Sequence, residues 1–282
     1  MGRLHQSRGG FTLIELSIVL VIIGLIVGGV LVGQDLIRAA GLKSVITDVN
    51  RYVTAIHTFQ TKYNNELPGD MPDATNYWGT SLWCPTGNST PGSTLTCNGN
   101  GDSQIGSGAF AQDGPGAGDA EAMLVWQHLA NAGLVGGGYT GFPASPIYQP
   151  GVNIPQSGAF PNAGFTIFYY GPISTGPLFF VGGGISHVIL FGGKSPYLVD
   201  NWAGTAAYPV LSTQDAYNID TKIDDGMPGT GKVFSLPKGS DFTPTGTPTA
   251  ACATGGPSAA ATATYDFTQT GPQCALLFVT GF

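Results

Sequence analysis

The chain has 282 residues, of which 44 are Gly and 20 are Pro, while only 10% are charged. This composition is typical of a loop-rich domain with short strands, and a hydrophobic content of 42% argues against a disordered chain. The formal charge is −7, and an acidic surface repels phosphate groups, so the composition argues against nucleic acid as a partner.

The chain begins with a short basic leader that contains no acidic residue and ends at Gly10. The next 22 residues, 11–32, contain one ionisable residue, Glu15, and are long enough to cross a bilayer as a helix. A carboxylate inside such a segment is costly and indicates a function with a positively charged partner. If the chain is cut after Gly10, the new amine of Phe11 on a neighbouring subunit would be such a partner.

The basic leader, the Gly10–Phe11 junction and the Thr-Leu-Ile-Glu-Leu sequence after it resemble the class III signal of type IV pilins and type II secretion pseudopilins. The resemblance implies that prepilin peptidase cleaves between Gly10 and Phe11, that the new Phe11 amine is methylated, and that Glu15 is the buried glutamate of the family. It further implies a structural subunit, not an enzyme, that assembles with its own kind and with other pilin-like subunits into a helical filament. The alternative is an ordinary membrane anchor.

The charge distribution predicts the orientation in the membrane. Arg3 and Arg8 precede the apolar segment and a large acidic domain follows it, so we expect the leader in the cytoplasm and the domain outside. Cleavage after Gly10 removes two of the 10 basic residues and leaves eight against 17 acidic residues, a net charge of −9. The expected location is the bacterial inner membrane, with one span and a periplasmic domain, and then a periplasmic or cell-surface filament.

The apolar segment continues as an amphipathic pattern with a spacing of three and four residues, typical of one helix face. No proline interrupts residues 11–67, so one continuous helix is expected, ending near Asn64. Four glycines in its first part favour either close helix packing or local loosening. The expected division is a leader at 1–10, a transmembrane and filament-core helix at 11–33, its amphipathic continuation at 34–66, and a globular domain at 67–282.

The globular domain is expected to begin with a long irregular region, residues 64–118. Further helices are expected at 119–131 and 214–225, strands at 165–170, 178–181, 187–191, 197–199, 232–236 and 275–279, and an exposed low-complexity loop at 243–264. The predicted class is α+β: a long helix packed on an antiparallel sheet. This order is similar to the pilin fold, with disulfide-closed loops.

The four cysteines lie in the part expected outside the cytoplasm, where thiols are oxidised. Of the three possible connectivities we favour the local one, Cys84–Cys97 and Cys252–Cys274. The alternatives are free thiols or a zinc site, but no C-x-x-C pair is present.

A polar loop places oxygen side chains at alternate positions, Asn98, Asn100 and Asp102, as in the first half of an EF-hand calcium loop. It lacks the glycine and the bidentate acid of that motif, although Asp113 or Glu121 could supply the acid. The alternative is a polar turn beside a disulfide.

A second candidate calcium site is the cluster Asp220, Asp224 and Asp225. Like charges four residues apart on a helix destabilise it, so either solvent or a cation compensates them. Pseudopilins often bind calcium in their C-terminal region, but no motif assigns that site to particular residues here.

Other features favour structural roles. The glycine-rich segment 226–233 resembles a phosphate-binding loop but lacks the hydroxyl residue that would hold magnesium, and His57, His128 and His187 lie in no catalytic motif. Six aromatic residues are expected mainly in the core: Tyr77, Trp78, Trp83, Trp126, Tyr139 and Phe142. Two alternatives stay open: a filament-tip or minor pilin that uses residues 84–113 and 243–264 as an adhesin or substrate-binding module, and a membrane-tethered enzyme.

Overall fold

The computed structural model describes residues 10, 12–82, 84, 92–106, 117–142, 148–169, 187–193, 208–235, 251–255 and 257–282, with the backbone alone at 117–120 and 257–259. The chain divides into two compact units, Met1–Gly41 and Leu42–Phe282. One helix, α1 (Leu13–Lys62), contributes residues to both units and has 50 residues. At 1.5 Å per residue it is about 75 Å long.

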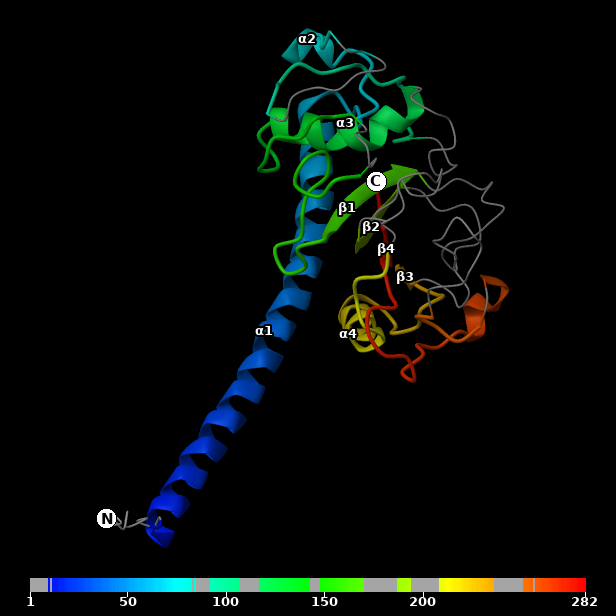
Figure 1. Ribbon diagram of the computed structural model, residues 1–282. Helices are drawn as coiled ribbons and strands as arrows, with labels where there is room; N and C mark the ends of the chain where they lie inside the picture. Colours follow the sequence, from blue (N-terminus) through cyan, green and yellow to red (C-terminus); the bar gives the residue numbers. More distant parts are fainter. Residues whose placement is uncertain are drawn as a thin grey trace, which may run out of the picture. The chain divides into compact units, whose positions relative to one another are not determined.

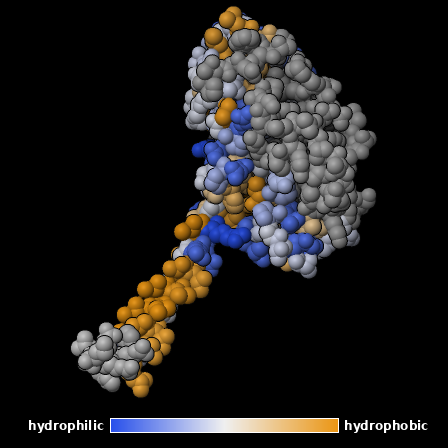
Figure 2. Space-filling model, in the orientation of Figure 1, coloured by the Kyte–Doolittle hydropathy of each residue, from blue (hydrophilic) through white to orange (hydrophobic). Residues whose placement is uncertain are grey.

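In the first unit, α1 carries an apolar surface that no other described residue covers. All side chains from residue 12 to residue 32 are exposed, and most of them are Leu, Ile or Val. On the side of the molecule that Figure 2 shows, this surface is almost entirely hydrophobic. Within the described residues α1 is the one helix that is long and apolar enough to cross a membrane.

In the second unit, α1 turns one face into the core. The buried residues follow a spacing of three and four, as the amphipathic pattern predicts: Leu42, Val45, Val49, Tyr52, Ala55, Ile56 and Phe59. The helix ends where Asn64 and Asn65 adopt left-handed backbone conformations, with φ of 52° and 68°. Asn tolerates this conformation better than most residues, which explains the end of the helix near the predicted position.

The second unit contains a four-stranded antiparallel sheet in the order β1-β2-β4-β3 (Figure 1). The strands are β1 (Ala163–Tyr169), β2 (His187–Gly193), β3 (Val233–Ser235) and β4 (Leu276–Val279). All seven residues of the central strand β2 are buried. The sheet therefore has no face that is open to solvent at β2.

Helix α3 (Ala117–Asn131) completes the core between α1 and the sheet. The ring of Tyr52 on α1 lies 4.9 Å from that of Trp126 on α3 and 5.1 Å from that of Phe165 on β1, edge to face in both cases. The second half of α1, α3 and the sheet thus share one core, and the α+β, pilin-like class predicted from the sequence is confirmed.

Shorter helices surround this core. They are α2 (Thr75–Trp78), α4 (Thr213–Ile223) and the 3-10 helix η1 (Pro257–Thr262). Ser212 caps α4, as its Oγ accepts a hydrogen bond from the backbone N–H of Asp215 at 3.2 Å.

Two disulfides, Cys84–Cys97 and Cys252–Cys274, join the cysteines in the local pairing. The expectation of an exposed loop at 243–264 holds for Thr254, Ala261, Thr262 and Thr264 in its described part. It is wrong for Cys252, Ala253 and Ala263, which are buried. Ala253 pairs with Tyr265 across this segment, which with the disulfide holds it in the core. The strands expected at 178–181 and 197–199 lie outside the described residues.

The expected aromatic core is confirmed for Trp126, Tyr139 and Phe142, which are all buried. It is wrong for Tyr77, whose side chain is 56% exposed although its ring contacts those of Tyr63 and Trp78. Trp83 lies outside the described residues.

Candidate functional site

The N-terminus of α1 is capped by two residues, Thr12 and Glu15, that hydrogen-bond to each other. Glu15 Oε2 accepts hydrogen bonds from the backbone N–H of Thr12 at 2.8 Å and from its hydroxyl at 2.9 Å. In return, Thr12 Oγ1 accepts a hydrogen bond from the backbone N–H of Glu15 at 3.3 Å. This arrangement is a capping box, which satisfies N–H groups that the first turn of a helix leaves unpaired. Gly10 is exposed and Phe11 lies outside the described residues.

The polar loop 98–106 is held in part by Asp70, which follows α1 in a turn. Asp70 Oδ1 accepts hydrogen bonds from the backbone N–H groups of Gly101 and Asp102 at 2.6 and 3.1 Å, and Oδ2 accepts one from Ser103 at 2.8 Å. A Cβ atom at Gly99 would overlap the backbone of Asp70, so this close approach requires glycine. The loop is therefore shaped around a carboxylate that is distant in sequence.

Glu121, on α3, holds the same loop at two further points. Its Oε1 accepts from the N–H of Asn100 at 3.0 Å and its Oε2 from the N–H of Gly106 at 2.9 Å. The residue is 1% exposed, and burial raises its pKa to about 7. The two backbone donors oppose this rise in pKa, while the charges of Asp70 and Asp102 add to it.

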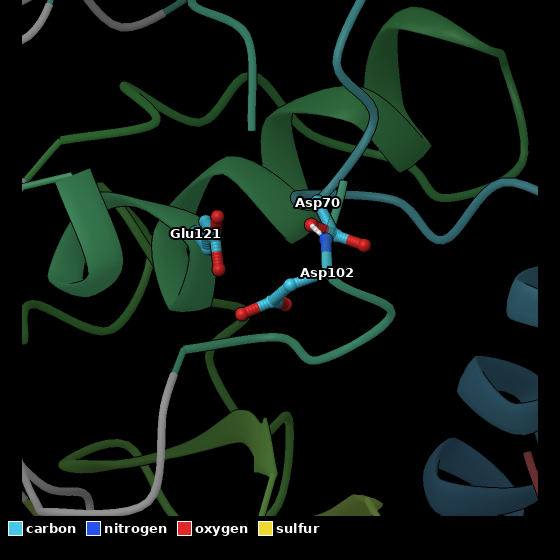
Figure 3. Close-up of side chains that lie close together, drawn as sticks. All are labelled: Asp70, Asp102 and Glu121. Atoms are coloured by element: carbon cyan, nitrogen blue, oxygen red, sulfur yellow. Dashed lines mark hydrogen bonds between the residues drawn. The ribbon is translucent and has the colours of Figure 1, made fainter. Parts of the chain in front are cut away.

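These carboxylates converge on one place in the fold. Asp70, Asp102 and Glu121 each place a carboxylate oxygen within 4.8 Å of the others, and Figure 3 shows Glu121 projecting from α3 toward the loop of Asp102. Oxygen donors of this kind suit calcium. Asn98 instead turns toward α2, where its Oδ1 accepts from the N–H of Thr75 at 2.9 Å. The alternate spacing identified Asp102 but missed Asp70.

The second cluster is built at the end of α4. Asp220 is fully buried, and its carboxylate accepts hydrogen bonds from the hydroxyl of Tyr265 at 2.8 Å and from the N–H of Gly226 at 3.2 Å. Burial, with a smaller contribution from the charges of Asp225 and Asp224, raises its pKa to about 7. The three aspartates lie within 4.8 Å of one another.

The glycine-rich segment after α4 donates hydrogen bonds from its N–H groups to these aspartates. Asp225 accepts from the N–H of Met227 at 2.9 Å and from the hydroxyl of Thr230 at 2.6 Å, and Asp224 accepts from the N–H of Lys232. A phosphate-binding loop offers such groups to its ligand and continues into a helix, whereas this segment continues into β3. The cluster thus organises a turn, and calcium at either acidic group stays a prediction.

Comparison with known protein families distinguishes an ordinary membrane anchor from one of the pilin type. Residues 5–31 match the family model described as the prokaryotic N-terminal methylation motif. The chain carries the N-terminal signature of type IV pilins and pseudopilins. No curated protein and no solved structure matches the chain. The pilin-like signature thus covers the capped start of α1 and most of its exposed apolar surface.

In this pilin-like chain two histidines have structural roles. His128 on α3 is fully buried; its Nδ1 accepts from the N–H of Gly69 at 2.9 Å, and its Nε2 lies 3.3 Å from the carbonyl oxygen of Cys97. Burial lowers its pKa to about 4. His187 Nε2 accepts from the N–H of Ile105 at 3.1 Å, and burial lowers its pKa as well. Both rings are therefore engaged as neutral acceptors by loops of the core.

A groove of about 720 Å³ lies beside the start of β1 and the end of β2. Prolines and two aromatic residues form much of its wall: Pro150, Pro161, Pro209, Pro272, Phe160 and Tyr208. The sequence does not predict this groove, because its wall is formed by loops that are far apart in the chain.

Proposed function

We propose that the chain is a structural subunit of the pilin or pseudopilin type. Prepilin peptidase removes residues 1–10, and the processed chain assembles with other pilin-like subunits into a helical filament of a type IV pilus or a type II secretion system. The observation that carries this proposal is the match of residues 5–31 to the methylation motif.

The exposed surface of α1 supports the assembly step. A row of exposed Leu, Ile and Val side chains from residue 13 to residue 32 is costly in water. Lipid covers this apolar surface before assembly, when the subunit is in the inner membrane, and the helices of neighbouring subunits cover it in the filament. Glu15 then sets the register, because an unpaired carboxylate in this apolar setting costs several kcal/mol and the Phe11 amine of a neighbour relieves that cost.

The role proposed here is non-enzymatic. The two buried histidines support it, since both are held by backbone groups of the core. The groove beside β1 favours one second candidate, a minor or tip subunit that binds a ligand of low polarity. Substituting Tyr208 and Phe160 by Ser would abolish attachment or secretion in that case, while filament number stayed unchanged.

Imaging of sheared surface material, probed with an antibody against this chain, tests the proposal. A pilin is expected in extracellular fibres, and a pseudopilin in short periplasmic filaments of cells that secrete. Mass spectrometry of the membrane-extracted chain should show the loss of residues 1–10 and a methyl group on Phe11. A full-length chain that stays monomeric in the membrane would refute the proposal.

A further inference from the structure

Charge is distributed unevenly along this chain. Residues 34–62, the second part of α1, carry four basic and two acidic residues, whereas residues 63–282 carry four basic and 14 acidic residues. The helix is therefore net positive, and the remainder of the globular unit is strongly negative. Segments of opposite net charge favour contact between two copies of the chain.

The exposed face of α1 in the second unit carries a row of threonines whose hydroxyl groups bond within the helix. Four threonines on this face donate their hydroxyl hydrogens to the carbonyl oxygen four residues earlier, at 2.8 to 2.9 Å: Thr47, Thr54, Thr58 and Thr61. Their hydroxyl groups donate within the helix and do not depend on solvent for an acceptor. This face, which we call the threonine face, also carries Lys43, Arg51 and Lys62.

Of these three cations, Lys43 is the one that the described part of the chain leaves available. Arg51 pairs with Asp48 at 3.0 Å and donates to the hydroxyl of Tyr52, and Lys62 donates to the carbonyl oxygen of Ala132 at 3.4 Å. Lys43 is exposed, and its ammonium group has no ion pair or hydrogen bond with any residue that the structure describes.

The acidic counterpart is the turn after α4. Asp224 and Asp225 lie there with the buried Asp220, all three carboxylates within 4.8 Å, and Asp225 is exposed. Their hydrogen-bond donors given by the structure are neutral, namely backbone N–H groups and the hydroxyls of Thr230 and Tyr265. A cation brought by another molecule would relieve the repulsion among them.

We propose that the threonine face of one copy docks through Lys43 against the Asp224–Asp225 turn of the next copy. The inference rests on the proposed filament function and names one contact within it. Because the two surfaces differ, the contact is head-to-tail, and its repetition builds an open helical assembly rather than a closed dimer. A pair of this kind is exposed, so its contribution falls with ionic strength and lies mainly in orientation and register.

Cysteine cross-linking of the full-length chain in its own cells tests the contact. With Lys43→Cys and Asp225→Cys in one chain, mild oxidation of filaments should give a ladder of covalent multimers on a denaturing gel. Lys62→Cys with Asp225→Cys is the matched control, since Lys62 lies on the same face nineteen positions further along, and it should give no ladder. In parallel, Lys43→Glu and Asp225→Lys should each lower filament yield several-fold, and the double variant should restore it.

The outcomes separate the contact from the proposed function. If the wild type forms filaments but the chain with both Lys43→Cys and Asp225→Cys gives no ladder, or the charge swap restores nothing, the contact is wrong and the subunit role stands. If Asp225→Lys abolishes a stabilising response to calcium and the swap fails, the turn is a cation site and the contact is again wrong. If the wild type itself forms no filaments and keeps its leader, the proposed function fails.

Discussion

Glu15 accepts two hydrogen bonds from Thr12, one from its backbone N–H and one from its hydroxyl, within the first turn of the helix. The same carboxylate is the group expected to meet the Phe11 amine of a neighbouring subunit. A cap needs only an acceptor oxygen at position 15, whereas an ion pair needs its negative charge. The two roles can therefore be separated by substitution.

We expect Glu15→Gln to lower incorporation into filaments about as strongly as Glu15→Ala. The amide oxygen of Gln can still accept from Thr12, but the charge is lost. Thr12→Val is the control: it removes the hydroxyl but keeps the carboxylate, and it should leave filament yield close to that of the wild type. The yield is measured in sheared fractions. A Gln variant that assembles normally would show that capping is enough.

We expect Gly10→Val to block removal of the leader. A β-branched side chain beside the scissile bond restricts the backbone that the peptidase must bind, while glycine leaves it free. The mass of the membrane-extracted chain should then include residues 1–10. Thr12→Val, two residues beyond the expected cut, serves as the processed control, and a Val variant of normal mature mass would contradict the assignment of the site.

Calcium is expected to raise the melting temperature of the detergent-solubilised chain, and Asp102→Asn should reduce this rise. Asp102 is exposed, and Asn can keep the acceptor that holds the N–H of Gln104, so the variant should fold as the wild type does without calcium. Asp73→Asn, also exposed, is the matched control. If wild type and both variants respond equally, Asp102 is no ligand.

Asp70→Asn is expected to destabilise the fold even without calcium. Asn offers one acceptor oxygen where Asp70 uses two, so at least one of the partly buried hydrogen bonds from the N–H groups of Gly101, Asp102 and Ser103 to the carboxylate is lost. The expected cost is about 1–3 kcal/mol. Chemical denaturation in a chelator measures it, and a loss equal to that of Asp102→Asn would contradict the role of Asp70 in shaping the loop.

The stability should depend on pH through Glu121. Its pKa is about 7 in the folded chain and near 4.5 in the unfolded chain, so the folded state holds the extra proton between these values. Its contribution to stability is therefore largest below pH 4.5 and declines as pH rises to 7. His128, whose pKa is lowered to about 4, acts in the opposite direction, adding stability as pH rises from 4 to 6.5.

Glu121→Gln isolates the carboxyl contribution, because His128 is present in both chains. In a chelator, the melting temperature of the Gln variant relative to the wild type should increase from pH 5 to pH 8. An equal difference at all pH values would show that Glu121 does not titrate in this range. If calcium binds beside this carboxylate, adding it should abolish the increase in the relative melting temperature of the Gln variant at pH 8.

Three parts of this protein could be predicted from the sequence because each depends on near neighbours in the chain. The N-terminal signature is read from adjacent residues, and the stripe of Leu42, Val45 and Val49 follows from helical periodicity. The end of α1 near Asn64 follows from local backbone preference.

The acidic site needed the tertiary structure. Asp70 joins Asp102 and Glu121 only because the turn after α1 and helix α3 both pack beside the polar loop, and no spacing rule relates positions that far apart. The exposed Tyr77 and the buried Cys252 were misjudged for the same reason. Burial and charge repulsion depend on distance in space, which the core packing sets, whereas periodicity and capping depend on distance along the chain.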